Sequence, residues 1–216
     1  MPIPTPDEEL GPRVLLRDVA FNKLLTAIQD GTLLPGERLN DVYHTIGSGV
    51  AGTPIREALS RLELIGLIDT AANRYTRIAN PTPEVLEESV DLLIGYGELA
   101  ARLALPKLGG TDADELFDLL DALVAESDDA KGSIRALSDV IEFFLSKIER
   151  PILATTVFET TQLALFSAGA GLSTPAFDAA SFDRDLRSAL SGHDATAASD
   201  AFRGLAQSFE ARSASR

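Results

Sequence analysis

Few side chains in this chain have the type and spacing to support catalysis or to hold a metal ion. The 216 residues contain no cysteine, which excludes disulfides, thiolate metal sites and a cysteine nucleophile. The two histidines, His44 and His193, lie far apart in the sequence, so a metal centre built from several imidazoles has too few ligands. No phosphate-binding glycine loop is present, which leaves carboxylates as the remaining reactive groups. We therefore expect a protein that is not an enzyme.

The charge is distributed unevenly along the chain. The net charge is −14, which is unlike the basic footprint of a non-specific nucleic-acid binder. Residues 1–80 hold 8 Lys and Arg against 10 Asp and Glu, whereas residues 81–216 hold 11 against 23. The acidity therefore belongs to the C-terminal part, and the first part is nearly balanced.

The composition and the N-terminus predict a globular cytoplasmic protein. The chain is 45% apolar and 24% charged, which is enough apolar material for a core. No segment has the run of about 18 apolar residues that a membrane span needs. The opening residues, MPIPTPDEEL, lack the basic start and apolar run of a signal peptide.

The elements of the first part follow a recognisable order. Residues 1–12 are rich in proline and acidic side chains and predict a flexible arm. The pattern then predicts a helix over 13–30, a turn over 34–36, a short helix over 40–48, a helix over 53–65 and a β-hairpin over 67–79. This is the order of a winged helix-turn-helix, in which the third helix enters the DNA major groove.

Asn80-Pro81-Thr82-Pro83 predicts a linker, and everything after it has helical periodicity. Six helices are expected, over 83–106, 111–127, 131–149, 152–169, 176–191 and 195–212. The predicted fold class is mainly α, with an N-terminal winged helix-turn-helix domain over 13–80 and an all-helical effector-binding and dimerisation domain over 81–216.

A linked set of short motifs occupies the first domain. The set is Leu34-Pro35-Gly36-Glu37-Arg38-Leu39, Gly49-Val50, Thr53-Pro54-Ile55-Arg56-Glu57-Ala58-Leu59, Arg61-Leu62-Glu63 and Gly66-Leu67-Ile68. Over about residues 14–80, it resembles the winged-helix domain of the GntR family of bacterial transcription regulators. The helical remainder is similar to the effector-binding domain of the FadR subgroup, and its six-helix length is similar to the shorter, VanR-like branch.

The resemblance implies a set of DNA-binding residues. Arg56 starts the expected recognition helix, where side chains face base edges or phosphates, and Arg38 precedes the second helix. The full set is Arg38, Thr53, Arg56, Arg61, Asn73, Arg74 and Arg77, of which the last three lie on the wing. Solvent exposure alone is the alternative for these arginines. Arg61 has a further alternative, an ion pair with Glu57 four residues earlier.

Several positions depart from the family pattern. A Ser-Arg or Thr-Arg pair is usual before Thr-Pro, and this chain has Ala51-Gly52, so a principal guanine-reading arginine is absent. Val42 replaces an arginine of the second helix, and Tyr75 replaces a glycine of the wing. His44 falls where the family has a buried leucine, and we expect a structural or surface role for it. Fewer cationic contacts predict weaker and less salt-sensitive binding.

The metal site of many FadR-subgroup members is not preserved. The resemblance aligns their Asp and three His ligands with Asp139, Phe143, Asp183 and Leu205. His193 lies beside the break at Gly192 and is expected to be exposed. Asp139 and Asp183 could still face each other, but two carboxylates make a poor site for a transition metal. We therefore expect no metal and no cofactor.

An apolar effector pocket is the expectation that remains for the second domain. An arginine that family members often place four residues before the glutamate at Glu98 is Ile94 here. The expected lining is Ile94, Asp139, Phe143, Phe144, Asp183 and Leu205. The alternative is a filled core without any ligand.

Three functions are compatible with these features. The leading hypothesis is a cytoplasmic, homodimeric transcription regulator that binds a palindromic operator and responds to a small, possibly apolar effector. The second is a regulator-derived dimer that has lost specific DNA binding and acts through protein partners or ligand sensing. The third is an enzyme that uses Asp139 with Asp183, the least favoured of the three.

Overall fold

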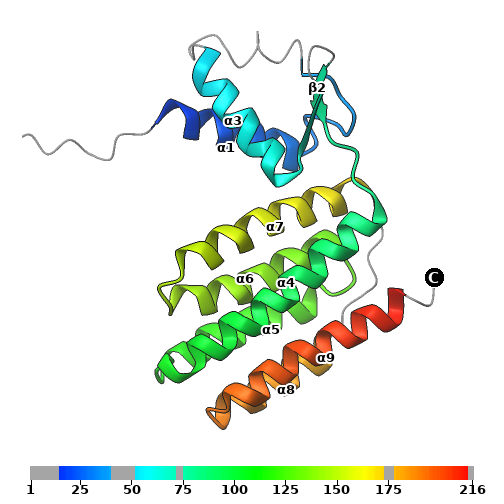
Figure 1. The fold of residues 1–216 in the computed structure, drawn as a ribbon. Helices are drawn as coiled ribbons and strands as arrows, with labels where there is room; N and C mark the ends of the chain where they lie inside the picture. The colour runs from blue at the N-terminus through cyan, green and yellow to red at the C-terminus, as the bar shows by residue number, and fades with distance from the viewer. Residues whose placement is uncertain (1–14, 40–51, 72–74, 173–177, 214–216) are drawn as a thin grey trace, which may run out of the picture. The chain divides into compact units, whose positions relative to one another are not determined.

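The computed structural model describes residues 15–39, 52–71, 75–172 and 178–213, which are mainly helical with one small sheet (Figure 1). Val42, His44, Ala51, Asn73 and Arg74 lie outside the described residues, as do the expected arm over 1–12 and short helix over 40–48. The chain divides into two compact units, Met1–Ala79 and Asn80–Arg216.

Two helices build the core of the first unit. Helix α1 (Leu16–Gln29) packs against α3 (Gly52–Ile65), and both place an apolar stripe of helical spacing between them. The buried side chains include Phe21 and Leu24 of α1 and Leu62 of α3. Both helices end before a glycine, as predicted, and Gly31 and Gly66 take the positive φ that glycine tolerates best.

The predicted hairpin is present. Strand β1 (Ile68–Ala71) pairs antiparallel with β2 (Tyr75–Ile78), and Asp69 stands opposite Arg77. Residues 37–39 extend this sheet, which the sequence did not predict. The Ile78 N–H donates to the Glu37 carbonyl at 2.8 Å, and the Leu39 N–H donates to the Thr76 carbonyl at 2.9 Å. Arg38 is thereby fixed beside the wing.

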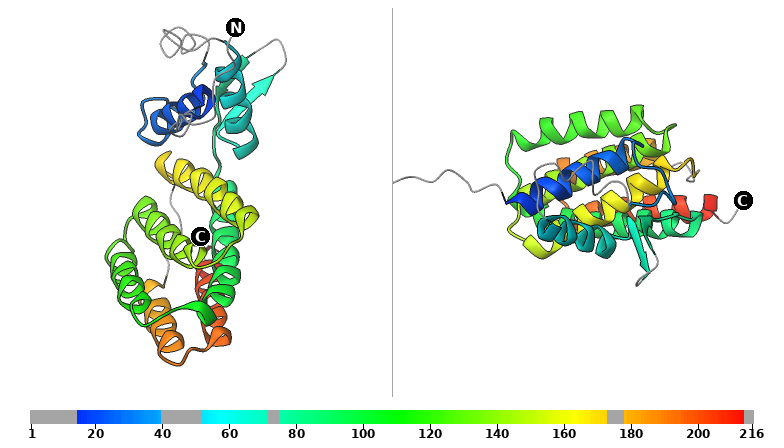
Figure 2. Two further views of the ribbon diagram at one scale, coloured as in Figure 1. Left: turned by 90° about the vertical axis from the view of Figure 1, so that its left-hand side faces the viewer. Right: turned by 90° about the horizontal axis from the view of Figure 1, so that it is seen from above.

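The second unit is a helical bundle, seen from two further directions in Figure 2. Its helices are α4 (Pro83–Ala104), α5 (Asp112–Ala125), α6 (Ala130–Ser146), α7 (Pro151–Gly169), α8 (Ala179–Ser191) and α9 (Ala195–Ser213). Side chains that accept backbone N–H bonds begin several of them, such as Thr82 for α4, Asp129 for α6 and Asp178 for α8. Among the described residues, the six predicted helices are confirmed.

The first of these helices ends earlier than predicted. Leu105–Lys107 form a short 3-10 turn, η1, because Pro106 lacks the N–H that an α-helix would use there. His193 is exposed, as expected, and takes a positive φ of 51° after α8.

Helix α4 is central to the bundle and packs against α6, α7 and α9. An aromatic cluster fills the space between the helices: Phe202 of α9 lies edge-on to Phe182 of α8 at 4.9 Å and to Phe144 of α6 at 6.4 Å between ring centroids. All three rings are buried. The close approach of α4 to α9 depends on Gly97, because a Cβ there would overlap the Phe202 ring.

Candidate functional site

The first turn of α3 presents polar side chains to solvent. Thr53 and Arg56 are exposed, while Ile55 of the same turn is buried against the core. Arg56 makes no ion pair within the described residues, so its guanidinium is available to an external anion. Gly52, the first residue of α3, offers no side chain at the place where the family usually has an arginine.

The two described arginines of the wing region differ in their surroundings. Arg38 is exposed and makes no ion pair within the part of the chain that the structure describes. Arg77 is half-buried, donates to Asp69 at 3.1 and 3.2 Å, and lies over the Tyr75 ring at 4.7 Å. Asp69 therefore neutralises part of the charge that Arg77 could offer to a phosphate.

Arg61 has a packing role that sequence reasoning missed. Its guanidinium lies 4.0 Å from the centroid of the Phe21 ring in α1, a cation–π geometry. The alternative pair of Arg61 with Glu57 is not formed. Glu57 instead forms an ion pair with Arg17 of α1, at 3.6 Å. Both contacts join α1 to α3, so no signal within the α3 sequence could reveal them.

Four of the predicted pocket residues belong to one continuous core. Ile94, Phe143, Phe144 and Leu205 are all buried in the main apolar cluster of the second unit. Phe143 lies edge-on to Phe144 at 5.5 Å between centroids. This packing favours the filled-core alternative at these four positions.

The two carboxylates do not form the pair considered above. Asp139 lies on the exposed stripe of α6, where neighbouring protein atoms shield it enough to raise its pKa and Arg135 partly opposes that effect. Asp183 accepts a hydrogen bond from Arg187 of the same helix, and Arg187 also donates to Asp121 of α5 at 2.6 Å. Asp183 is thus part of an ion-pair network that fastens α8 to α5.

The glutamate near the predicted pocket also has a structural partner. Glu98 of α4 accepts from Arg203 of α9 at 2.7 Å, so an arginine from a distant helix faces the acidic side chain. Within the described ranges, no group of three or more His, Cys, Asp or Glu side chains is placed to hold a metal ion. In the same ranges, no helix is both long enough and apolar enough to cross a membrane.

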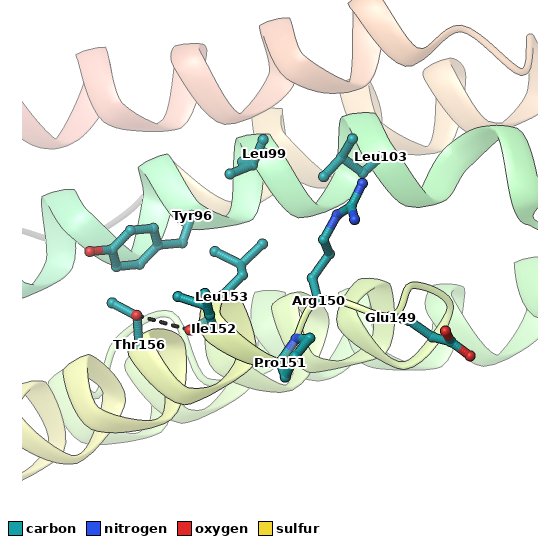
Figure 3. A pocket seen from close by; sticks show the side chains of 9 residues that line it. All are labelled: Tyr96, Leu99, Leu103, Glu149, Arg150, Pro151, Ile152, Leu153 and Thr156. Carbon is teal, nitrogen blue, oxygen red and sulfur yellow. Dashed lines mark hydrogen bonds between the residues drawn. The ribbon is translucent and has the colours of Figure 1, made fainter.

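An open apolar groove lies between α4 and the start of α7 (Figure 3). It measures about 660 Å³, and its lining is Tyr96, Leu99, Leu103, Glu149, Arg150, Pro151, Ile152, Leu153 and Thr156. The Arg150 side chain extends toward Leu103, and Glu149 points away from the groove. The predicted pocket residues contribute nothing to this groove.

Comparison with known proteins identifies the fold. No protein-family model matches the chain. It resembles E. coli McbR/YncC, with a TM-score of 0.63 and 21% identity over 92% of this chain and 96% of that one. It also resembles GntR from Rhodococcus sp. RHA1, with a TM-score of 0.61 and 20% identity over 90% and 95% of the two chains. The chain has the fold of the GntR-type regulators.

A curated relative matches the chain over part of its length. It is the uncharacterized HTH-type transcriptional regulator YdhC of Bacillus subtilis (strain 168), 31% identical over 110 residues. The match spans 51% of this chain and 47% of that protein. The fold is therefore shared over nearly the whole chain, and the sequence similarity over about half of it.

Proposed function

We propose that this chain is a DNA-binding transcription regulator that acts as a homodimer and whose helical unit senses a small molecule. The observation that carries the proposal is the exposed first turn of α3, where Thr53 and Arg56 face solvent on a winged unit. The GntR-type fold and the partial identity to an HTH-type regulator support it. Arg38 adds a second exposed cation beside the wing.

The distribution of charge agrees with this assignment of roles. The first unit is nearly balanced, and three of its acids, Glu57, Glu63 and Asp69, contact other side chains of the same unit. Arg38 and Arg56 form no ion pair with these acids and can meet phosphates or guanine edges. The second unit, with its large negative charge, is the part suited to dimerisation and sensing.

The test is binding of the full chain to DNA from upstream of its own gene, measured by fluorescence anisotropy at several salt concentrations. Arg56→Ala should cost about 1–3 kcal/mol if Arg56 contacts a base, or reduce the salt slope by about one if it contacts a phosphate. Arg38→Ala should reduce the salt slope by about one, as expected for the loss of a phosphate contact. Arg102→Ala, which removes an exposed cation from α4, is the control and should leave affinity unchanged.

A second function is favoured by Gly52 and by the pairing of Arg77 with Asp69, which both reduce the cationic surface. It is a regulator-derived dimer without specific DNA binding. Failure to find any bound sequence, in upstream DNA and in selection from random DNA, would favour this second function. Unchanged affinity of both arginine variants for a confirmed site would show that the proposed docking is wrong.

A further inference from the structure

Helix α7 is unlike every other described helix of the second unit in its composition. Its nineteen residues, Pro151–Gly169, contain one charged side chain, Glu159, whereas the other five helices carry four to six each. A helix that turns one face to water normally carries charged side chains on that face, and α7 has almost none. The composition of α7 therefore favours cover on more than the face that meets the bundle core.

The second unit itself covers only part of α7. Val157, Thr161, Ala164 and Leu165 are buried. The N-terminal half is different, because Ile152 is 84% exposed, and Leu153 and Thr156 are only partly covered. At the start of this nearly uncharged helix, Ile152 is thus a projecting apolar side chain that the described residues leave uncovered.

A hollow lies directly beside this projection. The groove of about 660 Å³ is walled by Tyr96, Leu99 and Leu103 of α4 and by the start of α7 (Figure 3). On α4 the apolar row continues outward to Leu92, which is 43% exposed. The groove is open to solvent, and an open groove encloses a small molecule poorly. A projecting side chain and a groove on the same face suit a dimer with a two-fold axis. In such a dimer, the projecting side chain of each copy can enter the groove of the other.

We propose that the α4–α7 face, formed by Leu92, Tyr96, Leu99, Leu103, Ile152 and Leu153, is covered by the same face of a second copy of this chain. The charges at its edge fit this partner. Arg150 and Glu149 are adjacent, exposed and without an ion pair within the described residues. Under a two-fold axis each can meet the opposite charge of the other copy, so the edge is complementary to itself. This inference rests on the homodimer of the proposed function and names its surface.

The first experiment measures the mass of the full chain by sedimentation at micromolar concentration. The wild type should sediment at twice 23.0 kDa. Ile152→Glu should raise the dimer dissociation constant about 30-fold or more, as the loss of a central interface residue does. Val124→Glu is the control, because Val124 is also exposed and apolar but lies on α5, outside the groove. It should leave the wild-type mass unchanged.

A second experiment uses the absence of cysteine from the chain. Single cysteines at Ile152 and at Val124 can be labelled with a maleimide without background. Ile152→Cys should react several times more slowly than Val124→Cys at concentrations where the chain is dimeric, and the difference should disappear on dilution.

The outcomes separate this inference from the proposed function. A dimeric Ile152→Glu variant with a fast-reacting Ile152→Cys would overturn the surface and leave the homodimer and DNA binding standing. A monomeric wild type would overturn both the homodimer and this surface, but not DNA binding by Arg56. Protection of Ile152→Cys in a monomer would assign the groove to another part of this chain or to an apolar ligand, and would also overturn the inference.

Discussion

Gly97 shows how a single residue without a side chain sets the spacing of two helices. The Phe202 ring occupies the space that a Cβ at Gly97 would need, and Phe144 and Phe182 prevent the ring from moving aside. Gly97→Ala should therefore destabilise the chain by about 1–3 kcal/mol through overpacking. Gly95, two residues earlier on α4, has open space around its Cβ position. Gly95→Ala should instead stabilise by about 0.4–1 kcal/mol. Urea unfolding of both variants measures the contrast, and two shifts of the same sign would contradict it.

The residues at the family's metal positions predict that the purified protein holds no transition metal. Phe143 and Leu205 are buried apolar side chains, and Asp183 is already paired with Arg187. Neutral imidazoles give such sites their affinity for zinc or nickel, and none stands at these positions. Elemental analysis of dialysed protein should find far less than one zinc, nickel or manganese per chain. A near-stoichiometric metal content would overturn the alignment of positions on which the expectation rests.

At the scale of elements, Lys147 connects the end of α6 to the start of α5. Its ammonium donates to Asp112 at 2.7 Å, lies 3.6 Å from Glu115 and lies over the Phe143 ring. The hydrogen bond from Lys147 is the largest cause that lowers the pKa of Asp112, and the Gly109 N–H adds to it. The pKa of Lys147 is raised by the same hydrogen bond.

This connection should contribute stability at neutral pH and lose it in acid. Because folding lowers the pKa of Asp112, its contribution is present above the pKa of the unfolded chain and falls as the pH drops through the folded value. Asp112→Asn should therefore lower the melting temperature at pH 7, and the difference from wild type should shrink as the solution is acidified. Asp114→Asn, an exposed change in the same helical turn, controls for the helix dipole. A difference that is independent of pH would show that the ion pair is not the cause.

The elements that the structure describes could be predicted from the sequence, because periodicity, caps and breakers are local signals. Gly31 and Gly66 follow the ends of helices, and the two strands of the predicted hairpin pair with each other. Contacts between elements could not be predicted in the same way. The spacing of Arg61 and Glu57 suits an i,i+4 pair, yet Phe21 and Arg17 of another helix take those side chains.

The predicted effector pocket also depends on contacts between elements. The family resemblance predicts Ile94, Phe143 and Leu205 as pocket lining, but matched positions do not show whether the side chains that face each other leave a cavity or fill it. In the structure these residues are packed in the core. The groove between α4 and α7 was not predicted, because it depends on how two helices far apart in the sequence lie side by side.

At the scale of the whole molecule, the net charge differs between the two units. The second unit carries a net charge of −12 and would repel the DNA backbone, so under the proposed function attraction to DNA must come from the winged unit. That unit is itself nearly neutral, with a net charge of −2. A single copy therefore has few cations for phosphate contacts, and under the proposed function we expect useful affinity for an operator to require two winged units in one dimer.

Substitutions that break the dimer at the α4–α7 face should consequently also weaken binding to an operator with two half-sites. Linking two binding units makes the second contact intramolecular, so a dimer binds two half-sites far more tightly than a monomer binds one. Ile152→Glu should reduce the affinity for a two-half-site operator by about 10²-fold or more and leave the weak affinity for an isolated half-site unchanged. Arg56→Ala should weaken both, because it removes the contact itself. Titration of the two DNA lengths with wild type, Ile152→Glu, Val124→Glu and Arg56→Ala distinguishes these patterns. Equal loss on both DNA lengths for Ile152→Glu would mean that this substitution damages the winged unit, and no loss on either would mean that the α4–α7 face does not hold the two copies together on DNA.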